Sequence, residues 1–203
     1  MEWLNHIDTE CFYWINHHHS TFTDWLMWIA SQSWSWVIVI LCIFVLLTLR
    51  QEPRRWWIVA LGIAFCFLLS DRISVLCFKN VVCRLRPCHA LEDVRMFRTT
   101  CGGLYGFISS HAANVFSLAM FFSLRYSHGK FKHAFLNRHS QVIVPLVLFM
   151  WALLVGYSRP YLGKHYPGDV LCGAIVGIAL GAFVYFVIRK LELFLECRKK
   201  SGK

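Results

Sequence analysis

Acidic side chains are few in this chain of 203 residues, with 11 Asp and Glu against 21 Lys and Arg. Charged residues make up only 16% of the sequence, whereas hydrophobic residues make up 57%. Soluble domains of this size usually carry more charge and fewer aromatic residues, so the composition argues against one. Five stretches lack Asp, Glu, Lys and Arg altogether: 25–49, 56–70, 99–124, 141–158 and 170–188.

Uncharged stretches of this length are typical of membrane-spanning helices. A bilayer core about 30 Å thick requires roughly 20 apolar residues in helical form. Unpaired backbone groups are too costly in lipid, which leaves the helix as the structure open to a single segment. We therefore predict an all-α integral membrane protein with a bundle of about five transmembrane helices.

The first 33 residues mix aromatic, apolar and polar side chains. This pattern predicts an N-terminal interfacial helix that lies along the membrane surface; the number of spans becomes six if that helix crosses the bilayer instead. The chain starts with an acidic rather than a basic segment, so we expect no cleaved secretory signal. We expect residues 1–203 to form one domain, with residues 1–33 at the outer face.

The net charge of +10 could suggest a nucleic-acid partner, but its distribution indicates a membrane instead. If the connections alternate across the bilayer, one side holds 13 Lys and Arg with 3 Asp and Glu, and the other side is neutral. Excess Lys and Arg mark the cytoplasmic side. Residues 189–203 then form a basic cytoplasmic tail, the N-terminus lies outside, and nucleic acid is not an expected partner.

Internal repeats are also absent from the sequence, and so is a pair of carboxylates that would require a metal ion. Transporters are commonly built from repeats and broken helices, so this class is not favoured. Without paired carboxylates, nothing in the sequence demands a metal ion, and we expect no cofactor.

Three polar clusters fall on the predicted outer side: KNVVCRLRP at 79–87, ISSH at 108–111 and SRPYLGKHYPGD at 158–169. Together they offer cations, hydroxyls, two histidines and a carboxylate at helix ends that can converge. Fixed cations and helix N-terminal amides stabilise the charge of a phosphoryl group in its transition state. The clusters therefore predict a site for phosphoryl transfer.

Within this site an imidazole can attack phosphorus and form a covalent intermediate, and a second imidazole can protonate the leaving oxygen. Asp169 lies four residues after His165 and can orient that ring, which favours His165 as the nucleophile. His111 is then left as the general acid. Pro167 is suited to the first helical position, and Ser109 to the N-cap of the helix that follows it.

These residues resemble the type 2 phosphatidic acid phosphatase superfamily, whose pocket is shared with vanadium-dependent haloperoxidases. The family pattern is Lys, six residues, Arg-Pro; then Pro-Ser-Gly-His; then Ser-Arg, five residues, His, three residues, Asp. The first and third motifs match in full. In the second motif Ile108 replaces proline and Ser110 replaces glycine. The resemblance covers roughly residues 56–188.

The resemblance implies a metal-independent membrane lipid phosphatase that works through a phosphohistidine. It implies His165 as nucleophile, His111 as acid and Asp169 as the partner of His165. The phosphate-binding residues that we expect are Lys79, Arg86, Ser109, Ser110 and Arg159.

Among the substrates of short bacterial relatives we favour undecaprenyl diphosphate, at the outer face of the inner (plasma) membrane. Phosphatidylglycerol phosphate and lipid A phosphates are the alternatives. A non-catalytic lipid-phosphate binder or transporter is the alternative of another class, and a soluble haloperoxidase-like oxidase does not need spanning helices.

Some features remain open at this stage. Arg84 can reach either phosphate or a carboxylate, and Asp71 with Arg72 can form an ion pair or line the pocket. Cys83, Cys88 and Cys101 fall in the outer loop, where a Cys88–Cys101 disulfide could tie the loop over the pocket. The run of three histidines at 17–19 resembles a metal tract but is more simply a solvated segment.

Overall fold

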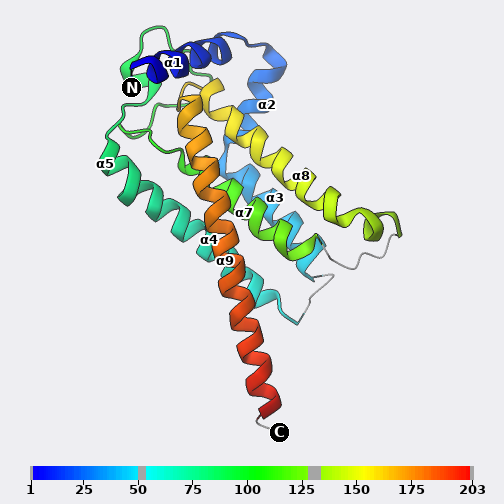
Figure 1. The fold of residues 1–203 in the computed structure, drawn as a ribbon. Helices are drawn as coiled ribbons and strands as arrows, with labels where there is room; N and C mark the ends of the chain where they lie inside the picture. Colours follow the sequence, from blue (N-terminus) through cyan, green and yellow to red (C-terminus); the bar gives the residue numbers. More distant parts are fainter. Residues whose placement is uncertain (1, 50–53, 128–133, 202–203) are drawn as a thin grey trace.

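Helices make up most of the part of the chain that the computed structural model describes, residues 2–49, 54–127 and 134–201 (Figure 1). The longer helices are α1 (Glu2–His17), α2 (Thr21–Ser31), α3 (Ser33–Ile43), α4 (Trp56–Ile73), α7 (Ser110–Tyr126), α8 (Ala134–Tyr161) and α9 (Pro167–Ser201). The π-helical segments η1 (Phe44–Leu49) and η2 (Ser74–Lys79) continue α3 and α4, and α5 (Asn80–Val82) and α6 (Pro87–Ala90) are short. These ranges contain no β-strand, only an isolated bridge between Leu85 and Tyr105. The connections at 50–53 and 128–133, which the charge pattern predicts on the cytoplasmic side, lie outside the described residues.

The predicted helix starts are confirmed at two positions that matter for function. Pro167 is the first residue of α9, where its missing N–H has no intrahelical partner to lose, and Asp169 lies in the first turn. Ser109 is the N-cap of α7, and its hydroxyl accepts a hydrogen bond from the Ala112 N–H at 3.4 Å. Both helices therefore begin at the same end of the bundle as the predicted site.

The lengths of the helices confirm an all-α, multi-pass membrane protein. Three continuous spans, Trp56–Val82, His139–Tyr161 and Pro167–Arg198, are long and apolar enough to cross a bilayer. A fourth is possible if α2 and the α3–η1 segment, bent by 68° at their junction, form one broken span. The remaining predicted span, α7, has 17 residues and packs against α4, α8 and α9 (Figure 1). The N-terminal helix α1 has 16 residues and is therefore too short to be a sixth membrane span.

The packing of α7 against α9 depends on glycines spaced four residues apart, which the sequence prediction did not use. A Cβ atom added at Gly173, Gly177 or Gly181 would lie 2.6, 2.4 or 2.1 Å from a carbonyl oxygen of α7. Only hydrogen at these positions lets the two backbones approach so closely, as in small-residue contacts between membrane helices. This contact fixes the start of α9 against the start of α7.

The N-terminal helices cover the end of the bundle at which α9 begins (Figure 1). Phe12 and Asn16 of α1 are buried, and the Asn16 side chain bonds both to Arg95 in the long loop and to the Tyr161 carbonyl. On α2, Asp24 accepts two hydrogen bonds from Arg95. Trp3 and Trp14 of α1 remain exposed. The interfacial position of α1 stays a prediction, but its attachment to α8 and to the loop is part of the fold.

The C-terminal end differs from the prediction that the last helix ends near Ile188. Instead α9 continues to Ser201 and extends beyond the rest of the bundle (Figure 1). Residues 189–201 contain no glycine or proline, and Lys, Arg, Leu and Glu all have high helix propensity, so nothing in the sequence ends the helix. Buried Arg125 and Glu192 form an ion pair at 2.7 Å on this part of α9. The cytoplasmic location of the tail stays a prediction.

Candidate active site

The three polar motifs meet in one cavity of about 560 Å³. Six of the eight predicted site residues line it: Lys79, Arg86, Ser110, His111, Arg159 and His165. They come from η2, the long loop, α7, the end of α8 and the α8–α9 connection. Residues as far apart along the chain as Lys79 and His165 are thus brought to one place by the packing of α7 against its neighbours.

His165 is almost fully buried, and its two ring nitrogens have different environments. Nε2 lies 3.1 Å from Nη1 of Arg86. Because a guanidinium only donates, this contact requires an unprotonated Nε2 with a free lone pair. Burial, and then the positive charges of Arg159 and Arg86, keep the pKa of His165 well below 6.5. The ring is therefore neutral at pH 7, as a nucleophile must be.

The other nitrogen of His165, Nδ1, faces Asp169. Its distance to Oδ2 is 3.6 Å, longer than a hydrogen bond, so in this state the carboxylate acts on the ring through charge and position. The same oxygen accepts a hydrogen bond from the Tyr166 N–H at 3.0 Å. Asp169 itself does not line the cavity but lies behind His165, as expected of a residue that orients the ring.

Arg84 is the ionic partner of Asp169, which answers one of the questions left by the sequence. Its Nη1 lies 2.9 Å from Oδ1 of Asp169 and 2.7 Å from Oδ2 of Asp8 on α1. The guanidinium also lies over the Tyr166 ring, 3.9 Å from its centroid. Asp8 in turn accepts a hydrogen bond from the Gly168 N–H at 2.7 Å. The N-terminal helix thus takes part in holding the carboxylate behind His165.

The cations of the cavity keep donors free for an anion. Lys79 donates to the Ser110 hydroxyl at 2.7 Å, and Arg159 donates to the Ser31 hydroxyl. The Nε atoms of Arg86 and Arg159 are buried and have no hydrogen-bond partner among the described residues. Buried donors are normally satisfied, and arginine suits phosphate oxygens particularly well. The arrangement therefore fits a bound phosphoryl group.

His111 also lines the cavity, from the first turn of α7. Its ring packs edge to face on Trp36, with 4.6 Å between centroids. Asn114, three residues later, also lines the cavity, and its buried Oδ1 lacks a partner in the described residues. We did not predict Asn114, although its spacing places it on the same helix face as His111.

Ser109 is placed differently from Ser110. Its fully buried hydroxyl caps α7 and does not line the cavity, while its N–H donates to the Asp169 carbonyl at 3.0 Å. Ser109 therefore joins the second motif to the third through the backbone. The phosphate-binding role expected for Ser109 stays a prediction.

One side of the cavity is apolar. Four of the apolar lining residues come from α3 and one from α4: Trp36, Val37, Ile40, Leu41 and Phe67. Asp71 also lines the cavity. A cavity lined both by cations and by hydrophobic side chains is suited to a ligand with a charged head and an apolar chain.

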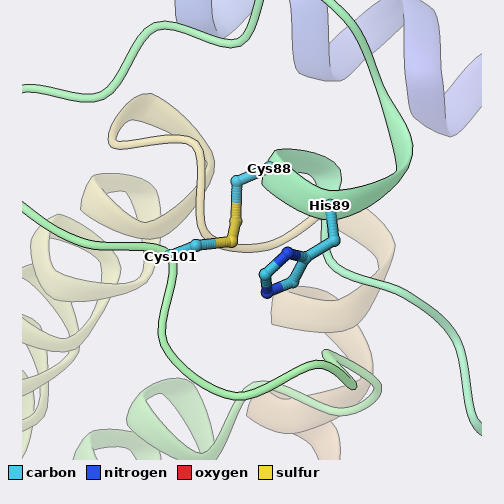
Figure 2. A group of neighbouring side chains, drawn as sticks. All are labelled: Cys88, His89 and Cys101. Carbon is cyan, nitrogen blue, oxygen red and sulfur yellow. A yellow bond between two sulfur atoms is a disulfide. The ribbon is translucent and has the colours of Figure 1, made fainter.

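The outer loop carries the disulfide that the sequence allowed. Cys88 and Cys101 are bonded, with their Cα atoms 5.9 Å apart, and Cys83 is free. Figure 2 shows His89 beside this bond, and the three side chains are the one group in the described residues with the proximity of metal ligands. Since a disulfide sulfur is not a thiolate, the bonded form does not offer that ligand set.

The sequence profile of the PAP2 superfamily matches residues 55–192, which include all three motifs. The chain is 32% identical over 200 residues to a lipid A 4'-phosphatase of Bacteroides thetaiotaomicron, covering 97% of this chain and 83% of that protein. It is 29% identical over 190 residues to a lipid A 4'-phosphatase of Porphyromonas gingivalis, covering 92% and 75%. A shorter match, 45% over 53 residues and 26% of each chain, is to the undecaprenyl-diphosphatase BcrC of Bacillus subtilis.

The fold is similar to that of a solved PAP2-type phosphatidylglycerolphosphate phosphatase from Bacillus subtilis. The TM-score is 0.67 at 20% identity, over 95% of this chain and 87% of that one. The sequence matches and the shared transmembrane fold agree with the motifs that meet in the cavity. The chain belongs to the PAP2 superfamily and is a membrane lipid phosphatase.

Proposed function

We propose that this phosphatase removes a phosphate group from a lipid A-type phosphorylated glycolipid by way of a phosphohistidine on His165. The observation that carries the mechanism is the convergence of two histidines and three cations in one cavity with an apolar wall. The similarity to lipid A 4'-phosphatases over more than nine-tenths of this chain supports the substrate class.

In the first step Nε2 of His165 attacks phosphorus while the bond from phosphorus to the leaving oxygen breaks. Lys79, Arg86 and Arg159 hold the non-bridging oxygens, and Arg86 moves from Nε2 to the phosphate as the substrate binds. His111 gives its proton to the leaving oxygen, which departs as an alcohol. In the second step water attacks phosphorus, its proton returns to His111, and the phosphorus–nitrogen bond breaks to release phosphate.

Lipid access from the side of the bundle is consistent with the apolar wall. Trp36, Val37, Ile40 and Leu41 lie along α3, so an acyl chain following them would remain among membrane helices. The headgroup then reaches the cations from within the bilayer. This arrangement suits a substrate that never leaves the membrane.

The membrane orientation that we propose is the one predicted from charge, with the site at the extracytoplasmic, periplasmic face of the inner membrane. The cavity lies at the end where α7 and α9 begin, whereas Arg55, Arg125 and Arg189 lie towards the other end. Positive residues favour the cytoplasmic side.

Undecaprenyl diphosphate, the substrate favoured from sequence, is the second candidate. It is supported by the match to BcrC, but that match spans only 53 residues. A non-catalytic binder is less consistent with two histidines that both line the cavity. The lipid A class therefore comes first.

Phosphate release by the purified protein from a panel of lipids tests the proposal. Lipid A-type phosphates, undecaprenyl diphosphate and phosphatidylglycerol phosphate are compared at equal surface concentration in one detergent. We expect the highest kcat/KM for the lipid A-type phosphates and no loss in EDTA. Replacing His165 with alanine should lower release by on the order of 10³ or more while the protein remains folded. A higher kcat/KM for undecaprenyl diphosphate would reverse the substrate proposal, and substantial turnover by the alanine variant would remove His165 as nucleophile.

A further inference from the structure

A second cavity of about 540 Å³ lies beside the catalytic one. The two share Ser33 and His111, so they meet at the side chain that we assign as the general acid. The second cavity is formed by the α2–α3 junction, the loop before Cys101 and the residue before His165. None of the three motifs of the family predicts it.

Every residue that lines this second cavity has a polar or charged side chain. Arg98 and Lys164 supply positive charge, and Ser31, Gln32, Thr99 and Thr100 supply hydroxyls and an amide. No acidic residue is among the described lining residues. This contrasts with the catalytic cavity, which has a hydrophobic wall, and it suits a ligand with many hydroxyls or further negative charge.

The two cations are held in place by their surroundings. The Arg98 guanidinium lies over the rings of Trp25 and Trp28, at 4.8 and 5.5 Å from their centroids. Burial, and then Arg159 and Arg86, lower the pKa of Lys164 to about 8, so the ammonium remains mostly charged at neutral pH. A bound anionic or polyhydroxy group would offset the repulsion among these cations.

The disulfide fixes the position of the loop between the two cavities. Thr100 directly precedes Cys101, and Cys88 follows Arg86 by two residues, so the bond in Figure 2 links a wall of the second cavity to a cation of the first. The two cavities are therefore held in a fixed relation. A ligand that enters both meets a preformed surface.

The direction of the reaction determines which part of the substrate lies near the second cavity. In an in-line displacement the leaving oxygen departs opposite the nucleophile, here opposite His165 and beside His111. The group attached to that oxygen must occupy space on the His111 side. Two spaces open there, the apolar wall along α3 and the polar second cavity.

We propose that the second cavity binds the sugar that carries the scissile phosphate, while the acyl chains follow α3. This inference rests on the proposed function, because it takes His111 as the acid and a lipid phosphate as the substrate. The leaving group of undecaprenyl diphosphate is a prenyl phosphate, which brings negative charge but no hydroxyls for Gln32, Thr99 and Thr100 to bind, whereas a glycolipid headgroup brings hydroxyls. The second cavity is thus a specificity site for a phosphorylated glycolipid.

The test compares two phosphomonoesters in the same detergent: a lipid A-type disaccharide phosphate and phosphatidic acid, which has no sugar. The ratio of their kcat/KM values is measured for the natural chain and for Arg98→Gln and Thr100→Val. Arg72→Gln is the matched control, since it removes one exposed positive charge outside both cavities. We expect the ratio to fall about tenfold or more in the two variants, as for a lost hydrogen bond to a charged or sugar group, and to stay unchanged in the control.

The outcomes separate this inference from the proposed function. If neither lipid releases phosphate with the natural chain, the proposed function fails. If both are hydrolysed and the ratio stays constant in Arg98→Gln and Thr100→Val, the sugar site is wrong while the phosphatase mechanism stands. The Arg98→Gln variant also loses the contacts with Trp25 and Trp28 and could unfold. Unfolding would be seen as loss of turnover on both lipids, and the ratio measured for Thr100→Val then decides whether the sugar site exists.

Discussion

His165 shows how neighbouring residues set the reactivity of one side chain. The ring is buried beside Arg86, with Arg159 close enough to lower its pKa further, and Asp169 lies 3.6 Å from Nδ1. Positive neighbours favour the neutral ring, and the carboxylate fixes the side on which the proton resides. The same cations that we propose as phosphate ligands therefore also keep His165 unprotonated.

This leads to a prediction at the residue scale about the titration of His165. Since its pKa in the folded protein lies below 6.5, the ring should remain neutral as the pH falls to 6.5 and take up a proton only at lower pH. The unfolded chain takes up that proton first, so acidification below pH 6.5 should also destabilise the fold. The measurement is an NMR titration of the histidine rings in selectively labelled protein, with the signal assigned by its loss in His165→Ala. A midpoint at or above pH 6.5 would contradict the account.

Site residues that follow a motif spacing were predictable from the sequence, whereas those positioned by tertiary contacts were not. Lys79, Arg86 and His165 were found because they sit at motif spacings in the chain. The contact of Asp8 with Arg84 and Gly168 was not predicted, because it joins α1 to residues far along the chain through tertiary packing. Asn114 carried a usable signal, its spacing from His111, whereas Asp8 had none in the sequence.

At the scale of helices, the contact between α7 and α9 determines the geometry of the site. His111 lies on the first turn of α7 and Asp169 on the first turn of α9. The glycines at 173, 177 and 181 allow the two backbones to touch. Movement of one helix away from the other would separate His111 from Asp169, to which we assign the roles of acid and orienting group.

Gly177→Ala tests this contact. The added Cβ would lie 2.4 Å from the Ala113 carbonyl oxygen, which is backbone and cannot move aside, so the helices must shift. We expect a loss of about 1–3 kcal/mol in the free energy of unfolding, together with lower kcat. Thermal unfolding in detergent and phosphate release are the two measurements.

Gly103→Ala is the control for that experiment, because no atom lies within 4 Å of a Cβ at this loop position. It should leave both the unfolding midpoint and kcat close to their original values. Unchanged stability and kcat in Gly177→Ala would show that α7 and α9 do not require this close approach.

Helix starts and ends were predictable to different degrees. Pro167 and Ser109 marked the starts of α9 and α7 because local chemistry, a missing N–H and a capping hydroxyl, decides them. The break at Gln32 between α2 and α3 lies within an uncharged stretch and carries no proline or glycine. The predicted end of the last helix was wrong because the basic residues 189–203 were interpreted as a tail, although the residues up to Ser201 favour helix.

At the scale of the molecule, apolar residues are concentrated along the helices and the polar residues of the cavity at one end of the bundle. The uncharged helices provide the lipid-facing surface, and the catalytic cavity lies at the end where α7 and α9 begin. The N-terminal helices and the disulfide-bonded loop cover this end through Asn16, Asp24 and Arg95. The helical membrane architecture followed from hydropathy alone, whereas the cover and the second cavity depend on contacts between distant segments.

The central claim is that His165 carries the phosphoryl group during turnover. The enzyme is mixed with its lipid phosphate, quenched within the first turnover and digested at alkaline pH, which preserves the acid-labile phosphorus–nitrogen bond. Mass spectrometry of the peptides should place a phosphoryl group on His165, and none should be found in His165→Ala. A phosphoryl group on His111, or unphosphorylated enzyme throughout steady release of phosphate, would contradict the account.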